Sequence, residues 1–174
     1  PHPLFRAIRS LLNQSPDLSH SLRLVYAGPH SHIWFSWIHA HNLQAIHHDL
    51  GHLPLPLTLG LQQASHLNIL LNWAGPAFSG ILTGKLYEYL ASRTPLLTLV
   101  NGPLPDPDLE TIARQSGGAK VFYARNAPET DIQNTLSHYL HAWHNGLPTT
   151  SPVIPDSLKW DFMMPNFLDS IEWP

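Results

Sequence analysis

Apolar positions along the chain follow two different spacings. Segments with apolar residues three or four positions apart predict helices, because those positions share one helix face. They cover residues 1–14, 34–43, 55–67, 83–92, 106–117 and 130–146. Between them stand short runs rich in Leu, Val, Ile and Phe, which are typical of buried strands. These runs are residues 22–28, 43–53, 67–73, 95–100 and 119–124. The run 43–53 has the weakest strand pattern of the five.

Helices and strands therefore alternate through the chain, with short connections. This order predicts an α/β fold with a Rossmann-like, doubly wound parallel sheet that is covered by helices on both faces. Residues 1–147 are expected to form this single domain. The Pro- and Thr-rich stretch that follows predicts a linker leading to a C-terminal helical tail, together residues 148–174. One feature is unusual for such a fold: no strand precedes the first helix.

Composition narrows the possible functions. The chain has 174 residues, 43% of them hydrophobic and only 12% charged, with a formal net charge of −3 and no basic run. A nucleic-acid binder would show a basic surface, so no nucleic-acid partner is expected. The apolar runs are much shorter than the roughly 20 residues of a membrane-spanning helix, so no transmembrane segment is expected. Cysteine is absent, which excludes thiolate chemistry and agrees with a cytoplasmic location.

The few charges of the central region are concentrated in one segment, TGKLYEYLASR. Between Asp49 and Asp106 the charged residues are Lys85, Glu88 and Arg93. A helix starting near Gly84, with Thr83 as N-cap, would direct the free N–H groups of residues 84–86 at the preceding loop, as in phosphate sites. Lys85 adds positive charge and Glu88 offers acceptors for a ribose diol. The alternative is an ordinary surface ion pair, three residues apart.

The sequence around this segment resembles a known family. SGILTGKLYEYLASRTPLLTLVNGP is similar to the nucleotide-sugar-binding signature of glycosyltransferases with two Rossmann-like domains, the GT-B fold, and the overall likeness is to group 1 or family 4 members. LGHLPLPLTLGLQQASHLNILL and DPDLETIARQSGGAKVF resemble the passages on either side. The resemblance covers most of residues 3–145 and implies the C-terminal, donor-binding half of such an enzyme.

The resemblance also implies roles for individual residues. Glu88 would bind the ribose of a nucleotide-diphosphate sugar. The other expected contacts group by ligand part: the diphosphate with Thr83, Gly84, Lys85 and Leu86; the base with the backbone at His52 and Leu53; the donor sugar with the loop Phe78, Ser79, Gly80, Ile81 and Leu82. Many family members have a second Glu at the position of Gly80. The resemblance therefore does not decide whether this position contacts the donor sugar. No cofactor besides the substrate is implied.

Family members also have an N-terminal acceptor-binding domain, a first strand and a glycine-rich loop ahead of the helix that opens this sequence. The 174 residues alone are therefore expected to bind a nucleotide sugar without transferring it, and to self-associate through the apolar edge that these parts would cover. In the intact enzyme a peripheral position at a membrane is an open alternative. Two other functions also stay open: a nucleotide-sugar epimerase of the same plan, and a non-catalytic nucleotide-binding or interaction module.

Histidine is the other conspicuous residue, with thirteen copies. The closest groupings are His39 with His41, residues 47–52, and the set His138, His141 and His144. The last set spreads further than the i,i+4 pair that zinc sites prefer, and so many histidines on a charge-poor surface are explained more simply as polar surface residues, so no metal site is predicted. The sequence does not identify a catalytic residue.

Overall fold

The protein is described by a computed structural model that places residues 2–29, 31–76 and 82–159. Within them the chain forms seven α-helices, five strands and two 3₁₀ helices. In chain order they are α1 (His2–Gln14), α2 (Leu18–Ser21), β1 (Leu24–Tyr26), α3 (Ser31–Ala40), η1 (Gln44–Ile46), β2 (His47–Asp49), α4 (Leu55–Ala64), β3 (Asn68–Trp73), α5 (Gly84–Ser92), β4 (Leu96–Asn101), α6 (Pro107–Ser116), β5 (Ala119–Tyr123), α7 (Glu129–His144) and η2 (Asp156–Leu158). The fold is α/β, as predicted.

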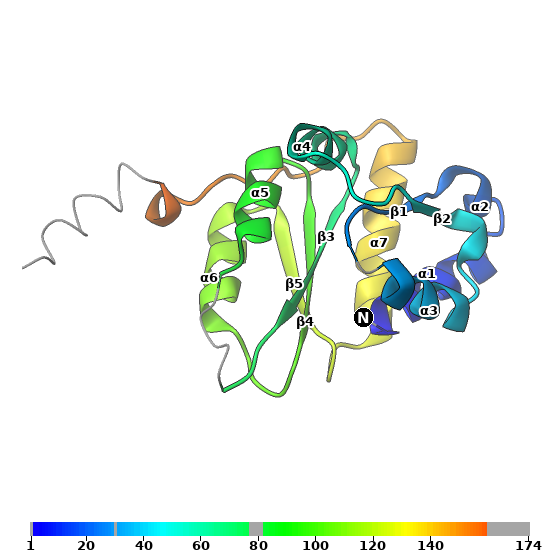
Figure 1. Ribbon diagram of the computed structural model, residues 1–174, viewed down its shortest axis with the longest axis horizontal. Helices are drawn as coiled ribbons and strands as arrows, with labels where there is room; N and C mark the ends of the chain where they lie inside the picture. Colours follow the sequence, from blue (N-terminus) through cyan, green and yellow to red (C-terminus); the bar gives the residue numbers. More distant parts are fainter. Residues whose placement is uncertain (1, 30, 77–81, 160–174) are drawn as a thin grey trace, which may run out of the picture.

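All strand pairings are parallel, but the strands form two sheets. β1 pairs with β2, with Leu24 opposite His47, and β3, β4 and β5 form the second sheet in that order. The alternation along the sequence predicted one continuous sheet. No described strand joins the two sheets, and Figure 1 shows β1 as the strand of the smaller sheet nearer to β3.

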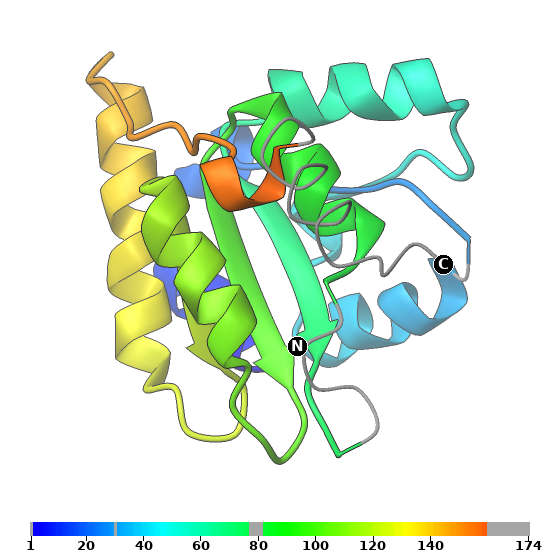
Figure 2. The same cartoon turned by 90° about the vertical axis from the view of Figure 1, so that its left-hand side faces the viewer.

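Helices cover both faces of the three-stranded sheet, which Figure 1 shows with α5 and α6 on one side and α7 on the other. Figure 2 views the sheet from the α5 and α6 side. The side chains of β4 explain this layering, because successive residues of a strand point to opposite faces. Leu97 and Leu99 belong to the core cluster with α1, α3 and α7, whereas Leu96 and Val100 pack with α5 and α6. β4 is therefore buried on both faces.

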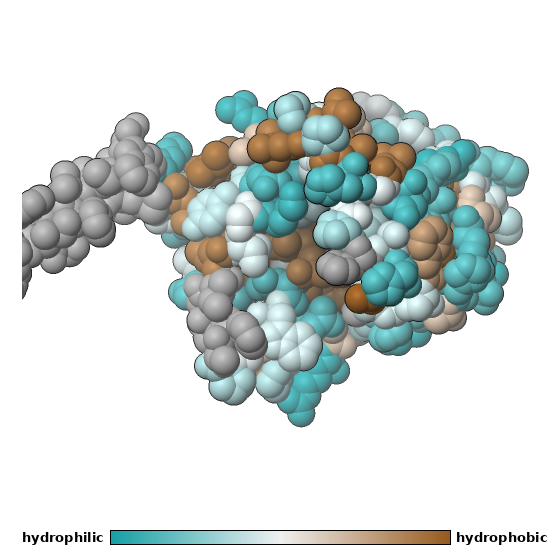
Figure 3. All heavy atoms as spheres, in the orientation of Figure 1, coloured by the Kyte–Doolittle hydropathy of each residue, from teal (hydrophilic) through white to brown (hydrophobic). Residues whose placement is uncertain are grey.

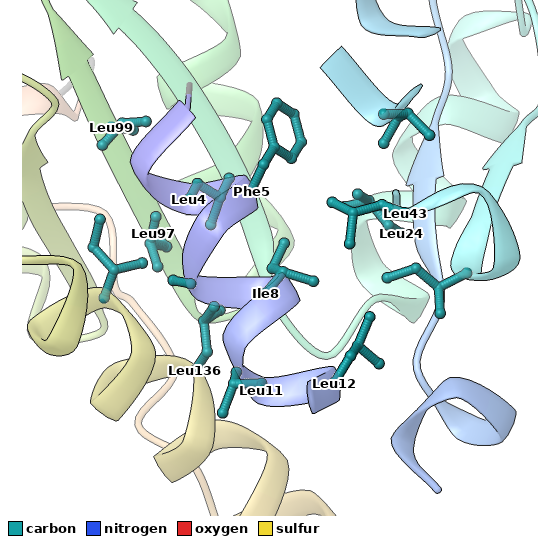
Figure 4. Packing of buried hydrophobic residues seen from close by; sticks show 14 of the residues in the cluster. Leu4, Phe5, Ile8, Leu11, Leu12, Leu24, Leu43, Leu97, Leu99 and Leu136 are labelled. Carbon is teal, nitrogen blue, oxygen red and sulfur yellow. The ribbon is translucent and has the colours of Figure 1, made fainter. Parts of the chain in front are cut away.

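The helix α1 crosses from one sheet to the other on the α7 side. Its buried residues Leu4, Phe5 and Ile8 lie in one cluster with Leu24 of β1 and Leu97 of β4. Figure 4 shows this helix between strands of the larger sheet and the elements that carry Leu24 and Leu43. The first helix of the sequence is thus the main packing element between the two sheets.

The second predicted strand, residues 43–53, is mostly not a strand. Residues Gln44–Ile46 form the 3₁₀ turn η1, and only His47–Asp49 pair with β1. The turn gives Ile46 a fully buried position in the core, and Gly51 with φ +63° ends the pairing at a point where glycine adopts the backbone easily.

The stretch predicted as a linker lies against the domain up to Lys159. The N–H of Val153 donates to the carbonyl of Ser116 at 2.9 Å, and Pro152 is buried. Leu158 packs on the cluster formed by α5 and α6. The predicted tail helix begins near Ser157, where the structure has the short η2, and the rest of it, from residue 160 on, lies outside the described residues. Among the described helices, none is long and apolar enough to span a membrane.

Candidate functional site

The segment that carries the charges starts α5 at the carboxyl end of β3. Thr83 is the N-cap, as predicted, but its hydroxyl makes no capping hydrogen bond. The N–H of Leu86 donates to the carbonyl of Thr83 at 3.0 Å, so it is not free as the sequence-based hypothesis required. The N–H groups of Gly84 and Lys85 are left, since the first amides of a helix have no acceptor within it. A Cβ on Gly84 would have no heavy atom of the described residues within 4 Å, so there is room beside the first residue of α5.

Glu88 is one turn further along α5 and is held by two donors. Lys85 Nζ lies 2.6 Å from Glu88 Oε2, and Gln62 Nε2 of α4 donates to the same oxygen at 3.0 Å. The side chains of Lys85 and Glu88 are 48% and 29% exposed. The structure therefore contains the i,i+3 ion pair that the sequence left as an alternative, and it adds Gln62, which sequence reasoning did not identify.

Gln62 itself is firmly fixed. It is buried, and its backbone carbonyl accepts hydrogen bonds from Thr94 Oγ1 at 2.8 Å and from Asn68 Nδ2 at 3.2 Å. Asn68 also donates to Ser92 Oγ, so the end of α4 is tied to β3 and to the end of α5. The Gln62 Oε1 atom is buried without a hydrogen-bond partner within the described part of the chain. The backbone of Gln62 is therefore held in place, and its buried side chain reaches the Glu88 carboxylate from this fixed position.

The same contacts change the acidity of Glu88. Hydrogen bonds from Lys85 and from Gln62 lower the pKa of the Glu88 carboxyl, and its partial burial opposes them only in part. Glu88 is consequently a carboxylate at neutral pH. Both donors use Oε2, so Oε1 retains its capacity to accept hydrogen bonds.

The other residues implied by the resemblance are less closely connected to Glu88. Of the donor-sugar loop, residues 78–81 lie outside the described residues, and Leu82 packs against the core cluster of α5 and α6. His52 is exposed in the loop between β2 and α4. The carbonyl of Leu53 accepts the Thr58 hydroxyl at 3.4 Å. The base pocket and sugar contact stay predictions.

A polar network near the carboxyl ends of the strands was missed by the sequence analysis. Asp106 is fully buried; one carboxylate oxygen accepts the N–H of Leu109 and the other accepts Asn72 Nδ2 at 3.3 Å. The N–H of Asp106 donates to the hydroxyl of Tyr123, which donates to Glu110 at 2.5 Å. Burial and this contact raise the pKa of Tyr123 to about 12. The only sequence signal was Asp106 as a helix N-cap, and the network links β3, α6 and β5.

The histidines do not assemble a metal centre in the part of the chain that the structure places. No group of three or more His, Cys, Asp or Glu side chains there could hold a metal ion. His41 lies with its Nε2 3.0 Å from Nδ1 of His2, and His39 Nδ1 lies 2.9 Å from Gln44 Nε2. These histidines instead connect helix ends at the surface.

Comparison with known proteins identifies no relative: no family model, curated protein or solved structure matches the chain. The likeness to glycosyltransferases therefore depends on the sequence passages alone, and the geometry at Glu88 must carry any functional argument.

Proposed function

We propose that the start of α5 and the Glu88 carboxylate form a binding site for a nucleotide diphosphate. In this proposal the domain is the donor-binding part of a glycosyltransferase that uses a nucleotide-diphosphate sugar, and an acceptor-binding domain outside this sequence completes the enzyme. The observation that carries it is the ionised Glu88 carboxylate, held by Gln62 one turn inside a helix whose first residue has open space beside its Cα.

The chemistry of the site matches the two parts of such a ligand. The helix start offers the amides of Gly84 and Lys85, the positive end of the helix dipole and the Lys85 ammonium, all of which favour a diphosphate. A carboxylate acceptor such as Glu88 suits a pair of ribose hydroxyls. Because the leaving group of the transfer is the nucleotide diphosphate, the same groups would stabilise its developing charge.

The Lys85–Glu88 ion pair would have to open when such a ligand binds. An exposed pair three residues apart on a helix contributes only about 0.2–0.5 kcal/mol. A charged hydrogen bond to a bound ligand contributes about 1.5–3 kcal/mol. Opening the pair therefore opposes binding only weakly, while Gln62 keeps Glu88 in place when Lys85 turns to the phosphate.

The arrangement of the strands agrees with this reading. Parallel strands with helices on both faces, and a candidate site beyond the carboxyl end of one strand, are typical of Rossmann-like, doubly wound folds. We therefore interpret the two sheets as parts of one such fold, the C-terminal half of a GT-B protein. This interpretation places Glu88 and the loop at His52 on the ligand side of the domain.

The test distinguishes binding of the diphosphate from binding of the nucleoside. Binding of pyrophosphate, and of a panel of nucleoside diphosphates and nucleotide sugars, is measured by calorimetry on the wild-type chain and on two variants. Glu88→Gln should weaken the nucleotides about tenfold or more, because one charged hydrogen bond is lost, and should leave pyrophosphate binding unchanged. Lys85→Met should weaken both, because its partner is the diphosphate.

The chain contains a matched control pair. Asp156 and Lys159 form another exposed i,i+3 ion pair at 2.6 Å, outside α5. Asp156→Asn and Lys159→Met should leave all affinities unchanged. Absence of nucleotide binding by the wild-type chain, or equal affinities for wild type and Glu88→Gln, would refute the proposal and favour a non-catalytic interaction module.

A further inference from the structure

The two sheets of the protein face each other with unpaired strand edges. β1 is bonded to β2 and β3 to β4, and no backbone hydrogen bond of the described residues joins β1 to β3. Figures 1 and 4 both show β1 on the β3 side of β2. Exposed edges of this kind are templates for pairing with a further strand.

The hydrogen-bonding groups along these edges can be assigned. The N–H of Asn68 donates to Pro95 and that of Ala74 to Asn101, so the even-numbered residues of β3 face β4. Strand residues alternate in this respect, and Ile69, Leu71 and Trp73 consequently direct their N–H and C=O groups to the open edge. In β1, Tyr26 bonds to Leu50 of the β2 side, which leaves Val25 facing away from β2.

The directions of the strands agree with one another. α4 returns the chain between β2 and β3, which makes these two strands run the same way, and the other pairings are parallel. A segment between β1 and β3 would thus be parallel to both. α1 and α7 run side by side in the same direction, since Arg6 binds Glu129 at 2.9 Å and Gln14 binds Gln133 at 2.8 Å. α7 follows β5, so α1 also begins at the carboxyl ends of the strands.

Aromatic side chains pack beneath the two edges. Phe5 of α1 is fully buried and meets Trp34 edge-on, with the ring centroids 5.1 Å apart, and Trp34 stacks on Tyr26 of β1. The indole Nε1 of Trp34 is buried but has no acceptor among the described residues. Figure 3 shows a recess with hydrophobic atoms on its floor beside β3. Val25 and Trp73 on the two edges are 39% and 57% exposed.

We propose that the gap between β1 and β3 binds an extended, mostly apolar peptide segment as a parallel strand, which joins the two sheets into one. The segment continues two existing parallel ladders, and its backbone groups pair with Val25 on one side and with the three odd-numbered residues of β3 on the other. Strands buried in this way on both sides are continuous apolar runs. The partner is therefore a peptide with the character of β4, not a polar or charged one.

A strand added to the N-terminus of the chain tests this directly. Such a strand, parallel to β3, would have its carboxyl end at the edge of the sheet where α1 begins, so a short loop can connect the two. The probe is a copy of β4, LLTLVN, joined to Pro1 by a loop of about three residues, a usual length for such connections. The control extension has proline in place of its Thr, which removes one ladder hydrogen bond. Amide hydrogen exchange is read residue by residue by NMR on the full chain.

The expected result is specific to alternate residues. In the unextended chain we expect the amides of Ile69, Leu71 and Trp73 to exchange quickly and those of Asn68, Leu70 and Asn72 to be protected, because only the second set bonds to β4. The extension should slow exchange of the Ile69, Leu71, Trp73 and Val25 amides about tenfold or more, because each gains a hydrogen bond to the added strand. The proline control should slow their exchange much less. If the extended chain does not fold, the free peptide is added to the unextended chain and the same amides are read.

Three results would overturn the proposal. The first is equal exchange of the odd-numbered amides with and without either form of the strand. The second is protection of these amides already in the unextended monomer. The third is protection that rises with the concentration of the unextended chain, which would show that a second copy occupies the gap.

Discussion

Replacing Gly102 by alanine should destabilise the protein through one close approach of two backbone segments. Gly102 follows β4 and has φ +111°, a backbone conformation that residues with a Cβ rarely adopt. A Cβ there would lie 2.0 Å from the carbonyl oxygen of Ala74, which follows β3. Ala74 is fully buried and its N–H donates to Asn101 at 2.7 Å, so the carbonyl cannot easily move away.

The expected loss is the sum of two effects. A strained backbone conformation costs about 1–3 kcal/mol, and forcing extra volume into a packed site costs about 1–3 kcal/mol. We expect a decrease in the free energy of unfolding of about 3 kcal/mol. For a chain of this size such a change lowers Tm by about 6–12 °C.

Urea unfolding and thermal melts of Gly102→Ala measure this loss, with Gly84→Ala as the matched control. Gly84 is the first residue of α5, and a Cβ there meets open space, so its replacement should change the unfolding free energy by less than about 0.5 kcal/mol. Equal stabilities of the two variants would show that the Ala74 carbonyl and Gly102 are not in this close contact, and would refute the reasoning.

Three further predictions concern the Glu88 contacts, Tyr123 and the segment after residue 147. The pKa of Glu88 is lowered in the folded state, so the stability it contributes is present above its ordinary value of 4.5 and is lost as the pH falls through the folded value. Urea unfolding as a function of pH should therefore show a smaller acid-dependent loss for Glu88→Gln than for wild type, and an unchanged profile would contradict the contacts with Lys85. Tyr123 has a raised pKa of about 12 against 10.0, so the unfolded chain ionises first and stability falls between these pH values. Tyr123→Phe should remove this part of the alkaline loss, and ultraviolet titration should show a late ionisation near pH 12 in wild type that the variant lacks; identical titration curves of the two proteins would argue against the network. Gly118→Ala would place a Cβ 2.2 Å from the backbone nitrogen of Pro152, so it should release residues 148–159 and speed their cleavage in limited proteolysis, with cleavage at the wild-type rate as the contrary result.

Most elements of the fold could be predicted because their signals are local. α6 is an example: Asp106 caps it, Pro107 starts it and Gly117 with φ +75° ends it, all within one stretch of sequence. β4 was recognisable as a strand buried on both faces from its continuous apolar run. The structure confirmed both.

Features that depend on distant contacts could not be predicted in this way. Gln62 lies 26 residues before Glu88, and nothing in its helical context distinguishes it from Gln63. Asn72, Asp106 and Tyr123 come together only when β3, β4 and β5 are in register. The division into two sheets is also a matter of spatial order, which the alternation of helices and strands does not contain.

At the α5 site, the sequence indicated the N-cap Thr83 and the pairing of Lys85 with Glu88 as one of two readings. It did not show that the N–H of Leu86 is occupied by Thr83. The choice between a surface ion pair and a nucleotide site depends on ligand binding, which the calorimetry of the Glu88 and Lys85 variants decides.

The position of Gln62 on α4 has a mechanical consequence. α4 is the covalent crossover from β2 to β3, and its last turn carries the amide that orients Glu88. A movement of the smaller sheet relative to the larger one would therefore be transmitted through α4. The C-terminal end of α4 is held by the hydrogen bonds of Thr94 and Asn68 to the Gln62 carbonyl. The distance from the Gln62 amide to the Glu88 carboxylate should therefore change when the relative position of the two sheets changes.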